Sequence, residues 1–131
     1  MIILDASVVV ATIRSKEPVA LPIVDAFRGV QAHAPELLDL EVTQALRRLT
    51  RRRELPPERA RLALDALIDS PIERWPHAPL LEGAWALRDR LTTYDAAYLV
   101  LADLLGAPLA TLDAGLASVA REIGVEVIAP G

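Results

Sequence analysis

The chain has 131 residues, of which 53% are hydrophobic, and a formal net charge of −4 at pH 7. This length predicts a single domain over residues 1–131 that can bury a core of its own. The absence of cysteine excludes disulfides and thiolate metal sites, and it suits the cytoplasm, where we expect the protein. Asp5 interrupts the apolar start, and no stretch reaches the roughly 18 apolar residues of a membrane span, so we expect no secretion signal and no membrane association.

Apolar runs, helix caps and chain breakers divide the sequence into alternating strands and helices. In chain order the pattern predicts a strand over 2–4, helices over 6–13 and 18–28, a strand over 30–33, helices over 36–53 and 57–69, a strand over 72–75, helices over 80–91 and 94–105, a strand over 109–112, a helix over 114–123 and a strand over 125–128. Because the strand runs are continuously apolar, they predict a parallel α/β sheet covered by helices on both faces. Ligands of such sheets bind outside the carboxyl ends of the strands, near a switch point.

Two aspartates, Asp5 and Asp113, each follow an apolar strand and precede a helix. The carboxyl ends of parallel strands meet at one edge of a sheet, so we expect both side chains there. Aspartate at a strand-to-helix turn is also a common N-cap, and this alternative stays open for each residue. Asp95 opens the helix at 94–105, where an acid either favours the helix dipole or belongs to a site.

Glu41 falls inside the apolar face of the predicted helix over 36–53, between Leu37 and Ala45 on a helical wheel. A glutamate that points toward the core requires a partner, because an unpaired buried charge is strongly unfavourable. One candidate is an arginine, Arg48, which lies two turns further along on nearly the same side of the helix. The other candidate is a metal ion.

Together these four acids predict a cation site. Two carboxylates ~4 Å apart repel by about 4 kcal/mol at an effective dielectric near 20, so four of them need protons or a cation among them. Oxygen ligands without cysteine favour Mg²⁺ or Mn²⁺, ions that hold water and phosphate oxygens in phosphodiester hydrolysis. The sequence therefore points to a metal-dependent phosphodiesterase with Asp5, Glu41, Asp95 and Asp113 as its acids.

Other familiar kinds of active site are missing from the sequence. It has no G-x-G-x-x-G, Walker A or G-x-S-x-G motif. Phosphoryl-transfer folds with an aspartate at a strand end also need a lysine at a late strand end, whereas the one lysine here, Lys16, lies in an early loop. Ser7 has no histidine nearby in sequence, so we expect its hydroxyl to serve the helix start or a metal-bound water. We expect His33 and His77 to be loop or edge histidines rather than ligands.

The basic residues are concentrated in one segment. Arg47, Arg48, Arg51, Arg52 and Arg53 fall within seven positions. Such a run is either a solvated helix end or a local patch for an RNA backbone. The mean hydropathy of +0.31 is high for a small monomer, and it is explained by a dense core or by apolar surface that a partner covers.

Several segments, in order and at matching spacing, resemble the PIN domain, specifically the VapC-type toxins of bacterial toxin–antitoxin pairs. They are Ile3-Leu4-Asp5-Ala6-Ser7, His33-Ala34-Pro35-Glu36-Leu37 leading to Glu41 and Ala45-Leu46-Arg47, Tyr94-Asp95-Ala96-Ala97-Tyr98-Leu99, Ala110-Thr111-Leu112-Asp113 and Gly124-Val125. The resemblance covers almost the whole chain.

This resemblance implies a three-layer α/β/α sandwich with a central parallel five-stranded sheet. It also implies a Mg²⁺- or Mn²⁺-dependent endoribonuclease that cleaves structured RNA such as tRNA or rRNA, forms a homodimer and is neutralised by a VapB-like antitoxin. Asp5, Glu41, Asp95 and Asp113 match the acidic quartet of the family, and Ser7 and Thr111 match its small hydroxyl positions. Gln44 stands where many members have Asn, and we include it as a supporting residue.

A second hypothesis is a PIN-like module that binds RNA or a protein without cutting RNA. The acids would then be N-caps and ion-pair partners. Millimolar Mg²⁺ or Mn²⁺ separates the two hypotheses, because it should stabilise a catalytic cluster and leave N-caps unaffected. For the enzyme, Arg47, Arg48 and Arg51 are the candidate RNA-binding residues.

Overall fold

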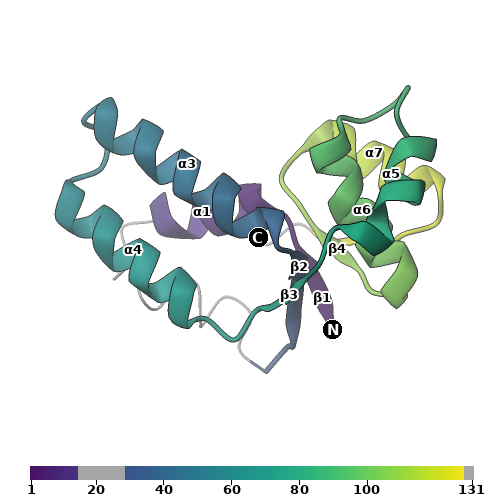
Figure 1. Cartoon of the computed structure of the whole chain (residues 1–131), viewed down its shortest axis with the longest axis horizontal. Helices are drawn as coiled ribbons and strands as arrows, with labels where there is room; N and C mark the ends of the chain where they lie inside the picture. Colours follow the sequence, from purple (N-terminus) through teal and green to yellow (C-terminus); the bar gives the residue numbers. More distant parts are fainter. Residues whose placement is uncertain (15–28, 129–131) are drawn as a thin grey trace.

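A computed structural model describes residues 1–14 and 29–128 of the chain (Figure 1). Its elements are β1 (Ile2–Leu4), α1 (Ala6–Arg14), β2 (Ala32–Pro35), α3 (Leu37–Arg51), α4 (Pro57–Asp69), β3 (Glu73–Trp75), the 3-10 helix η1 (Ala78–Leu80), α5 (Leu81–Ala86), α6 (Thr93–Leu105), β4 (Leu109–Ala110), α7 (Ala114–Glu122) and β5 (Val127–Ile128). The predicted helix over 18–28 lies outside the described residues. None of the helices in these two ranges is long and apolar enough to cross a membrane.

The five strands form one parallel sheet in the order β3-β2-β1-β4-β5. The chain proceeds outward from β1 to β3, then crosses back to β4 on the other side of β1 and continues to β5. The boundary between β1 and β4 is therefore the switch point of the sheet, where ligands of open α/β sheets bind. The register there pairs Leu4 with Ala110, so the residues that follow the two strands emerge side by side.

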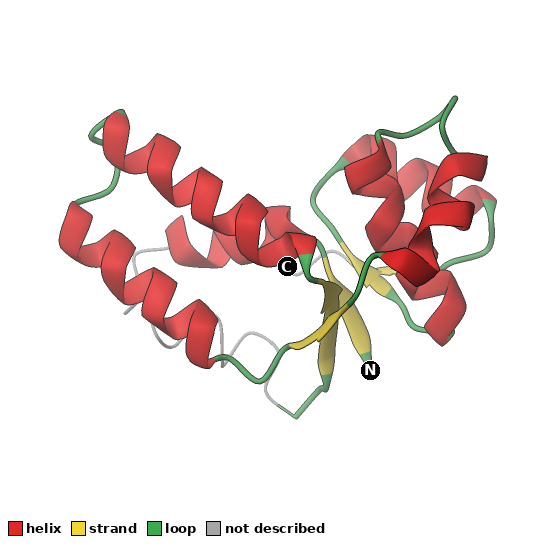
Figure 2. Cartoon of the chain, viewed as in Figure 1, coloured by secondary structure: helices red, strands yellow, loops and turns green. Residues whose placement is uncertain are grey.

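Helices cover both faces of the sheet, as predicted. Helices α1, α3 and α4 lie on one side and α5, α6 and α7 on the other (Figures 1 and 2). The central strands have no solvent on either face, since Ile3, Leu109 and Ala110 are fully buried. This is the three-layer α/β/α arrangement, and it explains why the strand segments are apolar without alternation.

The predicted helix over 80–91 is shorter and broken in the structure. The 3-10 helix η1 precedes α5, which ends at Ala86. Beyond it the backbone N–H groups of Leu87 and Arg88 bond three residues back, to Ala84 and Trp85, and the Arg88 guanidinium also donates to the Trp85 carbonyl. These bonds satisfy the last carbonyls of α5 and end the helix.

Two strands are also shorter than predicted, β4 at its carboxyl end and β5 at its amino end. Strand β4 ends at Ala110, two residues early, because the Leu112 N–H bonds to the Ser7 hydroxyl instead of a neighbouring strand. Strand β5 begins at Val127, because the Val125 N–H bonds to the Ala120 carbonyl and closes α7. The chain after β4 is thus free to turn toward β1.

Candidate active site

Asp5 is fixed at the carboxyl end of β1 by two hydroxyl groups. The Ser7 and Thr111 hydroxyls both donate to Asp5 Oδ2, each at 2.7 Å, and only 6% of the residue is exposed. The first turn of α1 is closed by backbone, with the Val8 N–H donating to the Asp5 carbonyl. Within the described residues no backbone N–H reaches the Asp5 carboxylate, so Asp5 is not the N-cap that the sequence allowed.

The other two aspartates differ in their local roles. Asp113 is the N-cap of α7, and its Oδ1 accepts from the Leu116 N–H at 2.9 Å. Asp95 is not a cap, because Thr92 caps α6 through a hydroxyl that accepts from the Asp95 N–H. The N-cap alternative thus holds for Asp113, whose Oδ2 receives no hydrogen bond within the described part of the chain.

Glu41 is half-buried on α3, and its partner is a tyrosine. The Tyr98 hydroxyl donates to Glu41 Oε1 at 2.5 Å, and Tyr98 itself has no exposed surface. The arginine expected as a partner, Arg48, is exposed, and none of the described ion pairs joins it to Glu41. Tyr98 is not among the site residues predicted from the sequence. The signal for it is a hydroxyl among the apolar residues of the helix that also carries Asp95.

The electrostatics of the site link all four carboxylates. Burial, followed by the charges of Asp5 and Asp95, raises the pKa of Glu41, against the effect of the Tyr98 hydrogen bond. Burial, followed by the charges of Asp113 and Asp5, raises the pKa of Asp95. The four acids come from four separate elements, yet each one is close enough to another to affect ionisation. The edge of the sheet therefore holds an excess of negative charge that no described basic side chain neutralises.

The chemistry of this cluster fits a hard divalent cation, since the side-chain atoms that could bind a metal are all carboxylate oxygens. As placed, no three acidic or histidine side chains in residues 1–14 and 29–128 are close enough to form a metal-binding group. The carboxylates are thus electrostatic neighbours rather than a finished coordination shell. Burial is the main cause of the raised pKa of Glu41 and Asp95, and repulsion from the neighbouring carboxylates adds to it. A bound cation would relieve that repulsion.

The remaining predicted residues lie outside this cluster. Gln44 is exposed on α3, and none of the described hydrogen bonds involves its side chain. Arg47, Arg48 and Arg51 are exposed on the half of α3 that runs away from the sheet toward α4 (Figure 1). Arg51 is ten residues beyond Glu41, which is roughly 15 Å along a helix.

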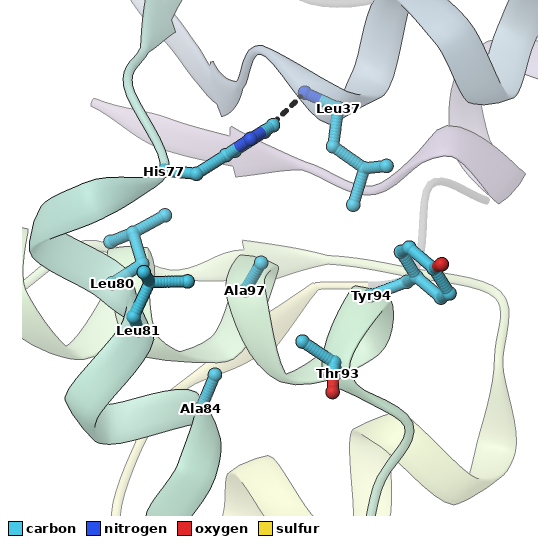
Figure 3. Close-up of a pocket in the computed structure, with 8 residues that line it drawn as sticks. All are labelled: Leu37, His77, Leu80, Leu81, Ala84, Thr93, Tyr94 and Ala97. Atoms are coloured by element: carbon cyan, nitrogen blue, oxygen red, sulfur yellow. Dashed lines mark hydrogen bonds between the residues drawn. The ribbon is translucent and has the colours of Figure 1, made fainter.

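The two histidines are structural. His33 is buried inside β2 rather than at an edge, and its Nδ1 accepts from the Trp75 indole N–H at 2.9 Å. Because Nδ1 is an acceptor, its 3.9 Å separation from Glu73 is not a charged pair. His77 Nε2 accepts from the Leu37 N–H at 2.9 Å and so caps α3 from outside the helix (Figure 3).

An apolar pocket of about 120 Å³ is enclosed by the start of α3, the η1–α5 segment and the start of α6 (Figure 3). Its lining is Leu37, His77, Leu80, Leu81, Ala84, Thr93, Tyr94 and Ala97. Leu37 is one turn before Glu41, and Tyr94 is adjacent to Asp95. The pocket and the acidic cluster therefore share the first turns of α3 and α6.

The fold and the cluster define a parallel α/β protein with a carboxylate site at its switch point. The sequence model of the PIN domain matches residues 2–122. Ribonuclease VapC1 of Mycobacterium tuberculosis is 42% identical over 117 residues, which are 88% of each chain. The chain therefore belongs to the PIN domain family.

Further comparisons agree with this assignment. Ribonuclease VapC12 of the same organism is 35% identical over 89% of this chain and 90% of its own. Among solved structures, PAE2754 from Pyrobaculum aerophilum has a TM-score of 0.71 and 23% identity, covering 96% of this chain and 82% of its own. FitAcB from Neisseria gonorrhoeae has a TM-score of 0.66 and 17% identity, covering 99% and 98%. At these identities the two structures show the shared fold.

Proposed function

We propose that this protein is a metal-dependent endoribonuclease, the toxin of a VapC-type toxin–antitoxin pair, which cleaves structured RNA such as tRNA or rRNA. The observation that carries the proposal is the convergence of Asp5, Glu41, Asp95 and Asp113 at the switch point of the sheet. The names of the two mycobacterial relatives support the reaction class.

In this proposal the four carboxylates hold Mg²⁺ or Mn²⁺, which when bound supplies an activated water and charge neutralisation at the phosphate. Ser7 and Thr111 keep the Asp5 carboxylate in one orientation. The Asp113 cap fixes that side chain through Oδ1. Each of these hydrogen bonds holds its carboxylate in place before the substrate binds, so that the acid does not have to reorient.

RNA contacts beyond the acids come from the exposed arginines of α3. Arg47, Arg48 and Arg51 lie beyond Glu41 on the same helix, and they are suited to phosphates several nucleotides from the scissile bond. Gln44 lies between Glu41 and these arginines in the sequence of α3, and we include it as a supporting residue. The net charge of −4 makes this local basic segment the favourable route for a polyanion.

The proposed partners are a VapB-like antitoxin and a second copy of the chain, in the cytoplasm. Large apolar side chains are exposed on α5, where Leu81 is 57% and Trp85 69% exposed. We propose that a partner covers this exposed apolar surface of α5. The high mean hydropathy of the chain, +0.31, is consistent with such coverage.

The second candidate function is a binding module without nuclease activity, in which the acids serve the fold. The observation in its favour is Asp113, which caps α7 as a purely structural aspartate would. Asp5 favours the enzyme instead, because it caps no helix and its charge acts on both Glu41 and Asp95.

The deciding experiment is cleavage of total RNA with mapped ends, comparing the wild type with Asp5→Asn. We expect Mg²⁺- or Mn²⁺-dependent cleavage by the wild type and none by the variant, which should remain folded. Asp103→Asn, an exposed acid at the far end of α6, is the matched control and should cleave as the wild type does. Full activity of Asp5→Asn would exclude the proposed active site.

A further inference from the structure

Tyr98 is buried inside the protein, yet its hydroxyl reaches the acidic cluster. The residue belongs to α6 and contacts Glu41 on α3, 57 positions earlier in the chain. The two helices belong to opposite layers of the sandwich (Figure 1). No other side-chain hydrogen bond among the described residues joins these two helices.

The direction of the hydrogen bond is set by chemistry, because an ionised carboxylate only accepts and the phenol donates. The bond occupies Glu41 Oε1 at 2.5 Å, and no described residue donates to Oε2. A glutamate side chain has several rotatable bonds, whereas a fully buried tyrosine ring is held by its packing. The phenol therefore limits the positions that the Glu41 carboxylate can adopt.

The same division of oxygens occurs at two other acids of the cluster. Asp5 uses Oδ2 for the hydroxyls of Ser7 and Thr111, and Asp113 uses Oδ1 for the Leu116 N–H. In each case the protein binds one oxygen and leaves the other without a donor from the described residues. Hydrogen bonds of this kind orient metal-binding carboxylates in characterised metalloenzymes.

We infer that Tyr98 is a positioning residue of the active site, whose hydroxyl anchors Glu41 Oε1 and leaves Oε2 available to the cation. This inference rests on the proposed metal-dependent function. A tyrosine that only ties α3 to α6 would contribute to stability and leave metal affinity unaffected, so the two roles predict different measurements.

The experiment compares Tyr98→Phe with Tyr94→Phe in the full chain. Both variants lose one phenolic oxygen from α6, but Tyr94 is exposed and has no described hydrogen bond to the acids. The probe is Mn²⁺, and the readout is the concentration that gives half of the maximal thermal stabilisation. Urea unfolding without metal reports folding, and RNA cleavage gives kcat and KM.

We expect Tyr98→Phe to raise the Mn²⁺ midpoint about tenfold, which is the lower end of the effect of such orienting groups. We also expect kcat to fall and KM for RNA to change less than kcat does. Tyr94→Phe should match the wild type. Glu41→Gln should also raise the midpoint, and adding Tyr98→Phe to it should raise the midpoint no further, because the anchored carboxylate is already gone.

A wild-type midpoint and kcat in Tyr98→Phe would overturn the role of Tyr98 alone. An equal shift in the Glu41→Gln background would overturn it too, since the effect would then not pass through Glu41. If the wild type gains no stability from Mn²⁺ and cleaves no RNA, the proposed metal site is wrong and the role of Tyr98 falls with it.

Discussion

Thr111 joins two acids of the site through one hydroxyl. Its Oγ1 donates to Asp5 Oδ2 at 2.7 Å and accepts from the Asp113 N–H at 3.0 Å. The residues are brought together by the parallel register of β1 and β4, although Asp5 and Thr111 are 106 positions apart. The hydroxyl is buried, so water cannot take over either bond.

Replacing Thr111 by valine keeps the shape of the side chain and removes both hydrogen bonds. We expect the free energy of unfolding to fall by about 1–3 kcal/mol, because a buried carboxylate oxygen loses a donor and a backbone N–H loses its acceptor. Urea unfolding of Thr111→Val and Thr111→Ser checks this, since serine retains the hydroxyl. Wild-type stability of Thr111→Val would show that the hydroxyl contributes nothing.

The raised pKa values of Glu41 and Asp95 predict how stability depends on pH in the metal-free protein. Between the ordinary carboxyl pKa, roughly 4, and the raised native value, the folded chain binds more protons than the unfolded chain. These two groups therefore make the free energy of unfolding fall as pH rises through that window, and the penalty is complete above it.

Glu41→Gln and Asp95→Asn remove this penalty. Without metal, we expect both variants to gain stability relative to the wild type as pH rises from 4 to 7.5, as measured by urea unfolding. With Mn²⁺ at pH 7.5 the order should reverse, because only the wild type retains the full set of charges that binds the cation. Asp103→Asn, outside the site, should show no such reversal.

The sequence predicted the positions of Asp5 and Asp113 because strand ends in a parallel sheet share an edge by construction. It also indicated that Glu41 turns inward, because the helical period places it among apolar residues. It did not predict the Tyr98 contact, which depends on how α3 and α6 cross in space. Local patterns carry no information about such a distance between chain segments.

The same limit explains the remaining differences in the fold. The end of α5 is reinforced by the Arg88 side chain, which donates to the Trp85 carbonyl, and at the end of β4 the Ser7 hydroxyl accepts from the Leu112 N–H. Both are side-chain to backbone contacts, which hydrophobic periodicity does not report. Within the described residues the order of strands and helices and the parallel type of sheet were predicted correctly, because apolar runs, caps and chain breakers are local signals.

A further prediction concerns Arg74, which we expect to stabilise the fold at a place remote from the acids. Its guanidinium donates to Asp39 Oδ1 on α3 and to the carbonyls of Leu67, Ser70 and Ile72 around the end of α4. Lysine carries the same charge but cannot form this planar set of bonds. We expect Arg74→Lys to lower the free energy of unfolding by roughly 2–3 kcal/mol in urea titrations.

The control for Arg74 is Arg61→Lys, at an exposed pair with Asp65 one turn along α4. An exposed pair of this kind contributes about 0.5 kcal/mol or less, so Arg61→Lys should unfold nearly as the wild type does. Similar losses in the two variants would mean that the carbonyl contacts of Arg74 contribute little to the fold.

The arginines of α3 give a prediction that separates RNA binding from chemistry. Changing Arg47, Arg48 and Arg51 together to alanine leaves the acidic cluster untouched, because all three side chains are exposed and lie beyond Glu41 on the helix. We expect KM for RNA to rise and kcat to change little. If all three contact phosphates, the slope of log affinity against log salt should become shallower by about two to three.

Arg121→Ala, an exposed arginine on α7, supplies the comparison for a change of charge alone. The proposed route for RNA along α3 predicts a salt slope for Arg121→Ala close to that of the wild type. A salt slope unchanged in the triple variant would place the RNA backbone elsewhere. In that case the arginine run is a solvated helix end, stabilised by the negative C-terminal dipole of α3.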